Sequence, residues 1–166
     1  ANMSILAKVY RLDNRKKEEI KLLSWLPLTH DMGLIGNVLL SLYLGGELTL
    51  LSPLTFIFSP LRWLKLISTY KAVLTMAPNF AYHLCCEKIK DAELVGLDLS
   101  CWETAVCGAE LVSSDVSDKF IKKYLPYGFS ENAFCPSYGM AEATLCISGS
   151  RGLTVNKLDK EQLKNN

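Results

Sequence analysis

A short segment near the carboxyl-terminal end, residues 136–142 with the sequence PSYGMAE, has the residue types of a nucleotide site. Tyr138 offers a flat ring on which a purine base can stack, and Gly139 permits a close approach to the backbone. Glu142 is an acid in uncharged surroundings, and a carboxylate beside a polyphosphate requires a divalent cation between them, so Glu142 is a candidate Mg²⁺ ligand. The residue types alone favour a plain turn in which Glu142 caps a helix.

A second candidate segment is residues 29–33, with the sequence THDMG. His30 is either a polar gate on an apolar cavity or a histidine satisfied within the core, and in isolation the core interpretation is favoured. We expect Asp31 to cap the following helix, because its side-chain oxygen can satisfy free backbone N–H groups.

Two further segments place small or polar residues next to apolar strands. Gly108 and Ala109 would let a flat base or a ribose approach the backbone, although a simple strand-to-helix turn explains them equally well. Asn79 and Phe80 are candidates to face the same crevice, and Phe80 is equally suited to the core.

Other motifs for nucleotides, metals and nucleophiles are missing from the sequence. There is no glycine-rich loop of the form GxxxxGK[ST] and no GxGxxG after a predicted strand. With only two histidines, His30 and His83, neither a zinc cluster nor a Ser-His-Asp triad can be assembled with any specificity. The six cysteines are scattered without a CxxC pair, which is typical of reduced thiols in a cytoplasmic protein.

Charge and hydropathy narrow the class of protein. The chain has 18 basic and 17 acidic residues and no basic stripe, so nucleic acid is not an expected partner. The longest uncharged apolar stretch, residues 32–46, falls short of the roughly 20 residues that cross a bilayer, so no transmembrane segment is expected. Between Ser24 and Leu61 only Asp31 and Glu47 are charged, as in a segment covered on several sides by other structure.

Short apolar strands alternate with helical patterns along the chain. The predicted strands are residues 21–26, 47–51, 72–75, 102–106 and a very short 133–135. The predicted helices are residues 1–12, 32–44, one beginning at 59, 79–89 and 114–124, with a helix or turn at 141–147. This alternation predicts an α/β fold with a doubly wound, mainly parallel sheet and flanking helices. Because ligands of such sheets bind outside the carboxyl ends of the strands, we expect all the candidate segments to face one crevice.

Six ordered segments together resemble the fatty acyl-AMP ligases, a branch of the adenylate-forming enzymes. Residues 24–36, SWLPLTHDMGLIG, are similar to the signature segment of that branch. The segments PNFAY, LDLS, GAE and PYGF follow in the order and spacing that the family shows. Residues 138–145, YGMAEATL, are similar to its adenylate motif.

The resemblance implies a reaction in two steps. A fatty acid would attack the α-phosphate of ATP, with Mg²⁺ as the cation, to give acyl-AMP and pyrophosphate. The acyl group would then pass to an acyl carrier protein or to a polyketide or peptide synthase module.

The resemblance also implies roles for residues at the matching positions. Tyr138 would stack on the adenine. The nucleotide-binding set would be Gly108, Ala109, Glu110, Tyr138, Gly139, Met140 and Ala141. The substrate-binding set would be His30, Gly33, Asn79 and Phe80. The catalytic residues would be His30, where the acyl tunnel meets the phosphates, and Glu142, the Mg²⁺ ligand. Ala141 replaces the usual threonine, which removes a hydroxyl from the phosphate site, and Leu111 replaces the usual proline.

The two ends of the chain suggest a portion of a longer enzyme. Residues 1–150 are expected to be part of an AMP-binding N-terminal domain, and the polar residues 151–166 are a candidate start of the insertion that marks these ligases. The phosphate loop and the catalytic lysine are expected outside this chain, so the piece alone is expected to be inactive. Two alternatives stay open: an acyl-CoA synthetase of the same superfamily, and a non-catalytic ligase-like domain that binds lipid or protein.

Overall fold

The computed structural model of the protein describes residues 2–156. Its strands are β1 (Lys21–Ser24), β2 (Glu47–Leu50), β3 (Leu74–Ala77), β4 (Thr104–Cys107), β5 (Phe134–Met140) and β6 (Leu145–Gly149). Its α-helices are α1 (Asn2–Val9), α2 (Asp31–Gly33), α3 (Leu40–Leu44), α4 (Pro53–Phe58), α5 (Pro60–Tyr70), α6 (Asn79–Lys88) and α7 (Ser114–Tyr124). All five predicted strands are present, and β6 and α4 are additional elements.

The strands form one sheet in the order β2-β1-β3-β4-β5-β6. Strands β1 to β5 are parallel to their neighbours, whereas β6 runs antiparallel to β5. The chain moves to one side of β1 to form β2 and to the other side to form β3, so the boundary between β1 and β3 is a topological switch point. The predicted α/β fold with a doubly wound, mainly parallel sheet is confirmed.

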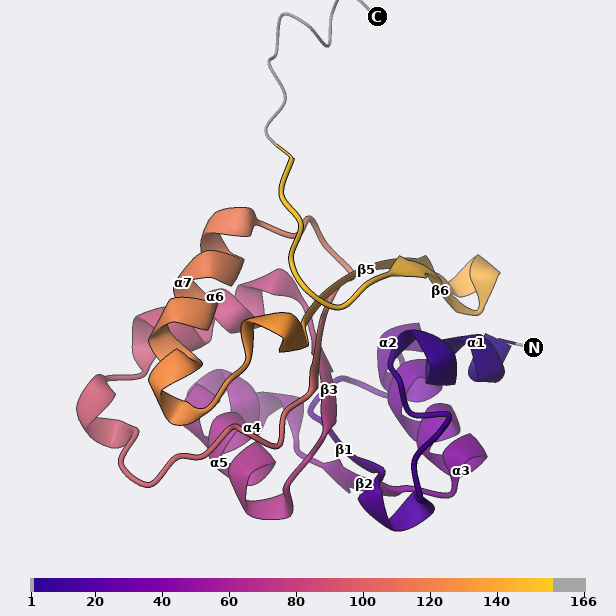
Figure 1. Ribbon diagram of the computed structural model, residues 1–166, viewed down its shortest axis with the longest axis horizontal. Helices are drawn as coiled ribbons and strands as arrows, with labels where there is room; N and C mark the ends of the chain where they lie inside the picture. The colour runs from indigo at the N-terminus through magenta and orange to yellow at the C-terminus, as the bar shows by residue number, and fades with distance from the viewer. Residues whose placement is uncertain (1, 157–166) are drawn as a thin grey trace, which may run out of the picture.

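Helices cover both faces of this sheet, as Figure 1 shows. Helices α1, α2 and α3 lie on one side, and α4, α5, α6 and α7 lie on the other. Strands covered on both faces are apolar throughout rather than alternating. Accordingly, every residue of β3 and of β4 is buried.

Local capping signals set the ends of α7, whose observed range matches the predicted one. The helix follows the N-cap Ser113, whose hydroxyl accepts a hydrogen bond from the backbone N–H of Val116. Asp115 lies in the first turn and Lys123 in the last, where each charge interacts favourably with the helix dipole. The cap residue and the charged residues at its two ends thus determine where α7 begins and ends.

Aromatic side chains fill the core between the sheet and helices α5, α6 and α7. The ring centroids of Trp63 and Trp102 lie 5.2 Å apart, and those of Tyr82 and Phe120 lie 5.0 Å apart, both in edge-to-face contact. The buried Tyr82 hydroxyl donates a hydrogen bond to the carbonyl oxygen of Val106 at 2.8 Å. This bond connects α6 to β4, next to the strand ends where the candidate segments meet.

The helical segment of residues 31–44 is continuous but irregular. Its middle, Leu34–Leu39, has π-helical hydrogen bonding. Buried Asn37 donates from Nδ2 to the carbonyl oxygen of Met32 at 2.8 Å, across the wider turn. A pattern with period 3.6 predicts a helix here, and it gives no sign of the π-helical turn.

In the carboxyl-terminal part of the sheet, the observed elements differ from the predicted ones. β5 extends to Met140 instead of ending at residue 135, so Tyr138 and Gly139 lie within a strand and not in a turn after it. Residues 141–147, expected to be a helix or turn, form a 3₁₀ turn (Ala141–Ala143) followed by β6. The chain reverses through Thr144, which has a φ of 56°.

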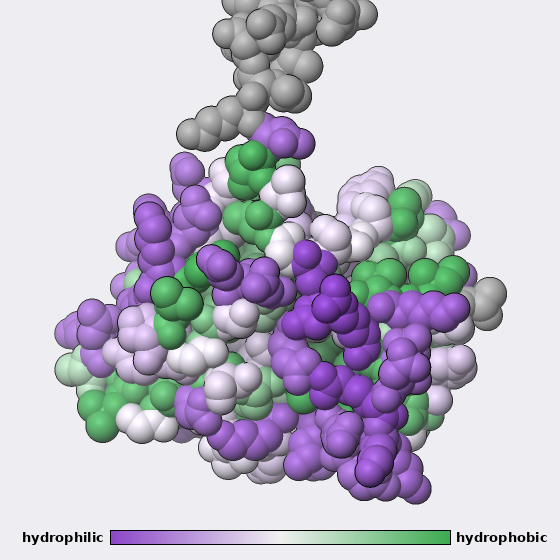
Figure 2. Space-filling model, in the orientation of Figure 1, coloured by the Kyte–Doolittle hydropathy of each residue, from purple (hydrophilic) through white to green (hydrophobic). Residues whose placement is uncertain are grey.

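The surface shown in Figure 2 carries hydrophilic side chains over much of its area, with apolar areas between them. No helix within residues 2–156 is long and apolar enough to span a bilayer. All six cysteines are free thiols, and those that are fully buried are Cys85, Cys107 and Cys135.

Candidate functional site

A cavity of about 400 Å³ lies at the carboxyl ends of β3, β4 and β5, close to the switch point beside β1. This volume is in the range of small-molecule sites, and its position is where doubly wound sheets bind ligands. The predicted site residues that line it are His30, Gly108, Ala109, Tyr138, Gly139, Met140 and Ala141. The structure therefore brings three of the candidate segments into one crevice, whereas the fourth, with Asn79 and Phe80, does not line it.

Tyr138 lies on β5 with 62 % of its surface exposed, so its ring is open to a ligand in the cavity. The pairing of β5 with β6 shifts register between Tyr138 and Gly139. Such a bulge re-aims the neighbouring side chains and is common beside active sites. The aromatic face at this position comes from an irregular strand and not from a loop.

Gly108 and Gly139 are required by close contacts between strands. A Cβ on Gly108 would lie 2.8 Å from the carbonyl oxygen of Ser137, and a Cβ on Gly139 would overlap the carbonyl oxygen of Leu145. Both positions line the cavity. The lack of a side chain at both positions therefore lets the neighbouring backbone pack closely beside the cavity.

Ala109 has a φ of 65°, in the left-handed region that residues other than glycine seldom adopt. It directly follows Gly108 at the end of β4 and lines the cavity. Strained residues of this kind cluster at functional sites, where the surrounding structure holds them in place.

His30 lies at the start of α2, with half of its side chain exposed. Its Nδ1 accepts a hydrogen bond from the backbone N–H of Met32 at 3.1 Å and lies 2.7 Å from Oδ1 of Asp31. Two expectations are corrected: His30 and not Asp31 occupies the N-cap position, and His30 is not a core histidine. Asp31 still contributes to the helix start, because Oδ1 accepts a hydrogen bond from the Met32 N–H at 2.7 Å.

Tyr10 forms part of the cavity wall and was not predicted. It follows α1 and is buried, and this burial raises the pKa of its hydroxyl far above the ordinary value. The hydroxyl is therefore neutral at physiological pH. No local motif marks Tyr10, because only the packing of α1 against the rest of the fold brings it to the cavity.

The cavity offers little charge and no activated thiol. Its lining includes no lysine or arginine, so His30 is the one lining residue in the described part of the chain that can become a cation. Burial raises the pKa of Cys107 to about 12 and also raises the pKa of Cys146, which lines the cavity. Neither thiol supplies a thiolate nucleophile at neutral pH.

Glu110, Asn79 and Phe80 lie beside the cavity but outside its lining. The Glu110 carboxylate accepts a hydrogen bond from the backbone N–H of Phe80 at 2.5 Å, and Oδ1 of Asn79 accepts one from the backbone N–H of Ser113 at 3.0 Å. These two bonds fasten the loop after β4 to the first turn of α6. Phe80 also meets Trp25 edge to face, with ring centroids 6.0 Å apart.

Gly33 and Glu142 also lie outside the cavity lining. Gly33 is buried, and a Cβ there would overlap the carbonyl oxygen of Pro27. Glu142 lies on the exposed 3₁₀ turn directly after Ala141, which does line the cavity. Residues 2–156 contain no group of three or more His, Cys, Asp or Glu side chains able to hold a metal. A Mg²⁺ beside Glu142 would thus take phosphate and water oxygens as its other ligands, which is a usual set for this ion.

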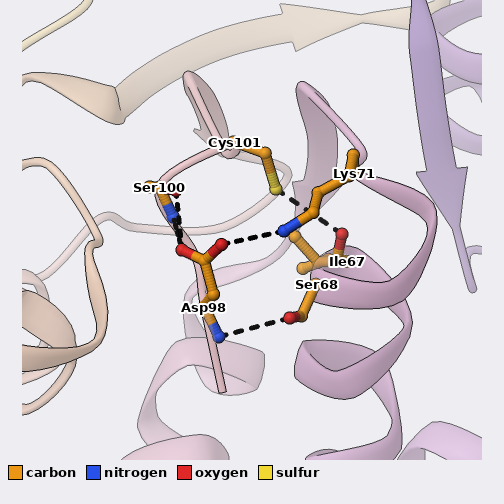
Figure 3. Close-up of polar contacts among 6 residues, drawn as sticks. All are labelled: Ile67, Ser68, Lys71, Asp98, Ser100 and Cys101. Atoms are coloured by element: carbon orange, nitrogen blue, oxygen red, sulfur yellow. Dashed lines mark hydrogen bonds and ion pairs between the residues drawn. The ribbon is translucent and has the colours of Figure 1, made fainter. Parts of the chain in front are cut away.

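A second polar cluster lies away from the cavity, near the amino ends of β3 and β4 (Figure 3). Lys71 pairs with Asp98 at 2.8 Å, and Asp98 accepts a hydrogen bond from the Ser100 hydroxyl at 2.6 Å. The backbone N–H of Asp98 donates a hydrogen bond to Oγ of Ser68 at 3.2 Å. The hydrogen bonds from Lys71 and Ser100 lower the pKa of Asp98 well below its usual range. This cluster holds the loop before β4 against the end of α5, and it has no part in the cavity.

Comparison with known proteins places these features in a family. A family model described as AMP-binding enzyme matches residues 1–165. A medium-chain-fatty-acid–[acyl-carrier-protein] ligase of Teredinibacter turnerae is 48 % identical over 126 residues, which are 76 % of this chain and 20 % of that protein. A long-chain-fatty-acid–AMP ligase of Mycobacterium bovis is 40 % identical over 144 residues, which are 84 % of this chain and 24 % of that protein.

Among solved structures, a fatty acyl-adenylate ligase from L. pneumophila in complex with acyl adenylate and pyrophosphate superimposes with a TM-score of 0.86. It shares 40 % identity, and the match covers 92 % of this chain and 26 % of that one. The chain thus spans about a fifth to a quarter of the length of these proteins. Since the family model matches nearly every residue, the chain belongs to the AMP-binding enzyme family.

Proposed function

We propose that the chain is part of a ligase that activates a fatty acid with ATP and passes the acyl group to an acyl carrier protein or to a polyketide or peptide synthase module. The observation that carries the proposal is the cavity, where His30, Ala109 and Tyr138 converge from three separate strand ends. The names of relatives 40–48 % identical, both fatty-acid ligases, support the class of substrate.

The side of the cavity formed by β4 and β5 suits an adenylate. Tyr138 offers an open aromatic face for the adenine, and the small, exposed Ala109 also lines the cavity. Met140 and Ala141 continue the wall toward Glu142. We assign the nucleotide to this side because the exposed aromatic ring of Tyr138 lies there, whereas Tyr10, which also lines the cavity, is buried.

The apolar part of the cavity lining suits the reacting end of a fatty acid. Met76, Val106 and Leu145 contribute apolar surface that can receive the first methylene groups. His30 also lines the cavity, and the carboxylate would lie beside it. Gly33, Asn79 and Phe80, which lie outside the lining, remain proposed contacts of the more distant acyl chain.

The chemistry joins two anions. The carboxylate oxygen bonds to the α-phosphorus of ATP, and the bond to the bridging oxygen of the departing pyrophosphate breaks. In the second step the carrier thiol sulfur bonds to the acyl carbonyl carbon, the bond from that carbon to the phosphate oxygen of AMP breaks, and AMP and the thiol proton are released. Mg²⁺ would supply positive charge to the phosphates, and we propose Glu142 as its protein ligand. Further cationic groups must come from outside the cavity lining, which offers only His30.

The proposal includes the organisation and the location of the enzyme. We assign residues 1–150 to an AMP-binding N-terminal domain and 151–166 to the start of an insertion, of which residues 157–166 lie outside the described residues. The six free thiols favour a reducing compartment, and we place the enzyme in the cytoplasm.

The test uses the complete ligase that contains this chain. It is incubated with ATP, Mg²⁺ and fatty acids of medium and long chain, with either a phosphopantetheinylated carrier protein or coenzyme A, and the products are identified by mass spectrometry. Acyl-AMP together with acyl-carrier thioester supports the proposal. Rapid formation of acyl-CoA would assign the protein to the acyl-CoA synthetases instead. Fatty-acid binding without any acyl-AMP would favour a non-catalytic ligase-like domain.

A further inference from the structure

Two arginines of the loop after α1 lie at the amino end of β4, whereas the cavity lies at the carboxyl ends of the strands. Arg15 forms an ion pair with Glu103, the residue directly before β4. Nε of Arg15 also donates a hydrogen bond to the carbonyl oxygen of Arg11 at 3.4 Å. Oγ1 of Thr104 donates a hydrogen bond to the carbonyl oxygen of Tyr10 at 3.4 Å, which holds the same loop against this strand end.

A third arginine, Arg151, reaches the same place from the chain that follows β6. The backbone N–H of Gly152 donates a hydrogen bond to the carbonyl oxygen of Phe134 at 2.8 Å, so Arg151 lies beside the first residue of β5. There β5 pairs with the beginning of β4, which directly follows Glu103. The register of the sheet therefore brings Arg151 close to the Arg15–Glu103 pair.

The charges of this arginine cluster do not balance. Glu103 makes the only ion pair with the three arginines within residues 2–156, so three cations share one anion. Burial, followed by the positive charge of Arg11, lowers the pKa of Arg151. Nε of Arg151 is buried and has no hydrogen-bond acceptor within residues 2–156. Since a buried N–H is costly without a partner, the cluster lacks an anion with acceptor oxygens.

We propose that Arg11, Arg15 and Arg151 form a binding site for an oxyanion, that is, a phosphate or carboxylate group. A guanidinium presents paired N–H donors in one plane, which match two oxygens of either group. One such group would give the buried Nε of Arg151 an acceptor and would offset the charge that Glu103 leaves. In Figure 2, strongly hydrophilic side chains gather on the face where Figure 1 shows the chain after β6 and the loop after α1.

Two sources of the oxyanion differ in how they act on stability. The first is a free ion such as inorganic phosphate. The second is a carboxylate side chain in the rest of the ligase, of which this chain spans about a fifth to a quarter. In an empty site the three positive charges repel one another, so removing one of them leaves the fold equally stable or more stable. In a site filled by a carboxylate, the same change removes a favourable pair.

The test measures the Tm of the complete ligase, without Mg²⁺ or nucleotide, as sodium phosphate is added. Sodium chloride at matched ionic strength is the control for screening. If a free ion fills the site, phosphate should raise the Tm by about 1–3 °C and the rise should saturate. Arg151→Gln should abolish the rise, and Arg62→Gln, at an exposed position on α5, should retain it. A rise that persists in Arg151→Gln would place the phosphate elsewhere and overturn the proposal.

The same variants test the second source. If a carboxylate of the ligase fills the site, phosphate has no effect on the wild type, and Arg151→Gln lowers the Tm by about 1–3 °C while Arg62→Gln does not. If Arg151→Gln does not fold, Arg11→Gln, at an exposed position in the cluster, replaces it in both tests. No response of the wild type to phosphate, together with an undiminished Tm of the cluster variant, would show that the site is empty and would overturn the proposal. None of these measurements depends on the proposed reaction.

Discussion

The carboxylate of Glu110 accepts a hydrogen bond from the backbone N–H of Phe80, 30 residues earlier in the chain, at 2.5 Å. This bond satisfies one of the free N–H groups at the start of α6 and places a negative charge where the helix dipole favours it. Glu110 therefore connects the loop after β4 to α6 and stands outside the cavity lining. Its position supports the shape of the site through Ala109, its neighbour in the sequence.

Replacing Glu110 should therefore destabilise the fold. We expect Glu110→Ala to lower the free energy of unfolding by about 0.5–1 kcal/mol, the usual cost of losing a side-chain acceptor at a helix start. Urea unfolding followed by circular dichroism measures the change. Glu87→Ala removes an exposed acid from the last turn of the same helix and is the matched control, with no loss expected. Equal stability of Glu110→Ala and the wild type would contradict the assignment.

Tyr138 should contribute to nucleotide affinity and little to stability. Its ring is largely exposed, so Tyr138→Ala removes a stacking face without opening the core. We expect the Kd of the complete ligase for AMP to rise by about tenfold, the scale of base–aromatic stacking, while Tyr138→Phe stays close to the wild type. Isothermal titration calorimetry gives both values. An unchanged Kd in Tyr138→Ala would place the base elsewhere.

Gly139 should tolerate no side chain. A Cβ at this position would overlap the Leu145 carbonyl oxygen across the β5–β6 hairpin, so Gly139→Ala must push the two strands apart. A destabilisation of about 2 kcal/mol is expected from this overpacking, together with loss of AMP binding. Ser148→Ala, at an exposed position on β6, is the control and should leave the free energy of unfolding unchanged. A stable Gly139→Ala variant would mean that the hairpin can open without affecting the sheet.

The Lys71–Asp98 pair should make stability depend on pH at both extremes. The pKa of Asp98 is lowered in the folded state, so its contribution is present above the unfolded value of about 4 and is lost as the pH falls below it. The pKa of Lys71 is raised, so its contribution is present below about 10.4 and is lost as the pH rises beyond that value.

Asp98→Asn tests this pair. Because both groups are exposed and screened by solvent, we expect a decrease in Tm of only about 1–3 °C at neutral pH. The difference from the wild type should shrink as the pH falls below about 4 and should vanish only below the lowered pKa of Asp98 in the folded state. Asp118→Asn, at an exposed position on α7, should show no such dependence. A difference that does not shrink as the pH falls would mean that Asp98 acts through its backbone turn and not through its charge.

The elements with strong local signals were predictable from the sequence. The helical pattern of residues 114–124 predicted the range of α7, and the uncharged segment around β1 indicated strands buried on both faces. These features depend on residues near one another in the chain. The gathering of His30, Ala109 and Tyr138 also followed from the rule that ligands bind at the carboxyl ends of parallel strands.

The features that were missed depend on contacts between distant residues. Tyr10 reaches the cavity only through the packing of α1, and no pattern in the first ten residues indicates this position. Gly139 suggested a turn, whereas it permits the close pairing of β5 with β6. The Glu110 carboxylate, a predicted member of the nucleotide-binding set, also accepts a hydrogen bond from the first turn of α6, and no local pattern indicates this contact. In each case the contacting residue lies too far away in the sequence to be inferred.

The central claim is that this cavity belongs to an enzyme that joins a fatty acid to AMP. Exchange of labelled pyrophosphate into ATP by the complete ligase tests it most directly, because the exchange requires reversible formation of an acyl-adenylate and no acyl acceptor. We predict exchange that depends on added medium- or long-chain fatty acid and that falls by about 100-fold or more in Glu142→Ala. Absence of exchange with every fatty acid tested, in a folded enzyme that binds ATP, would contradict the account.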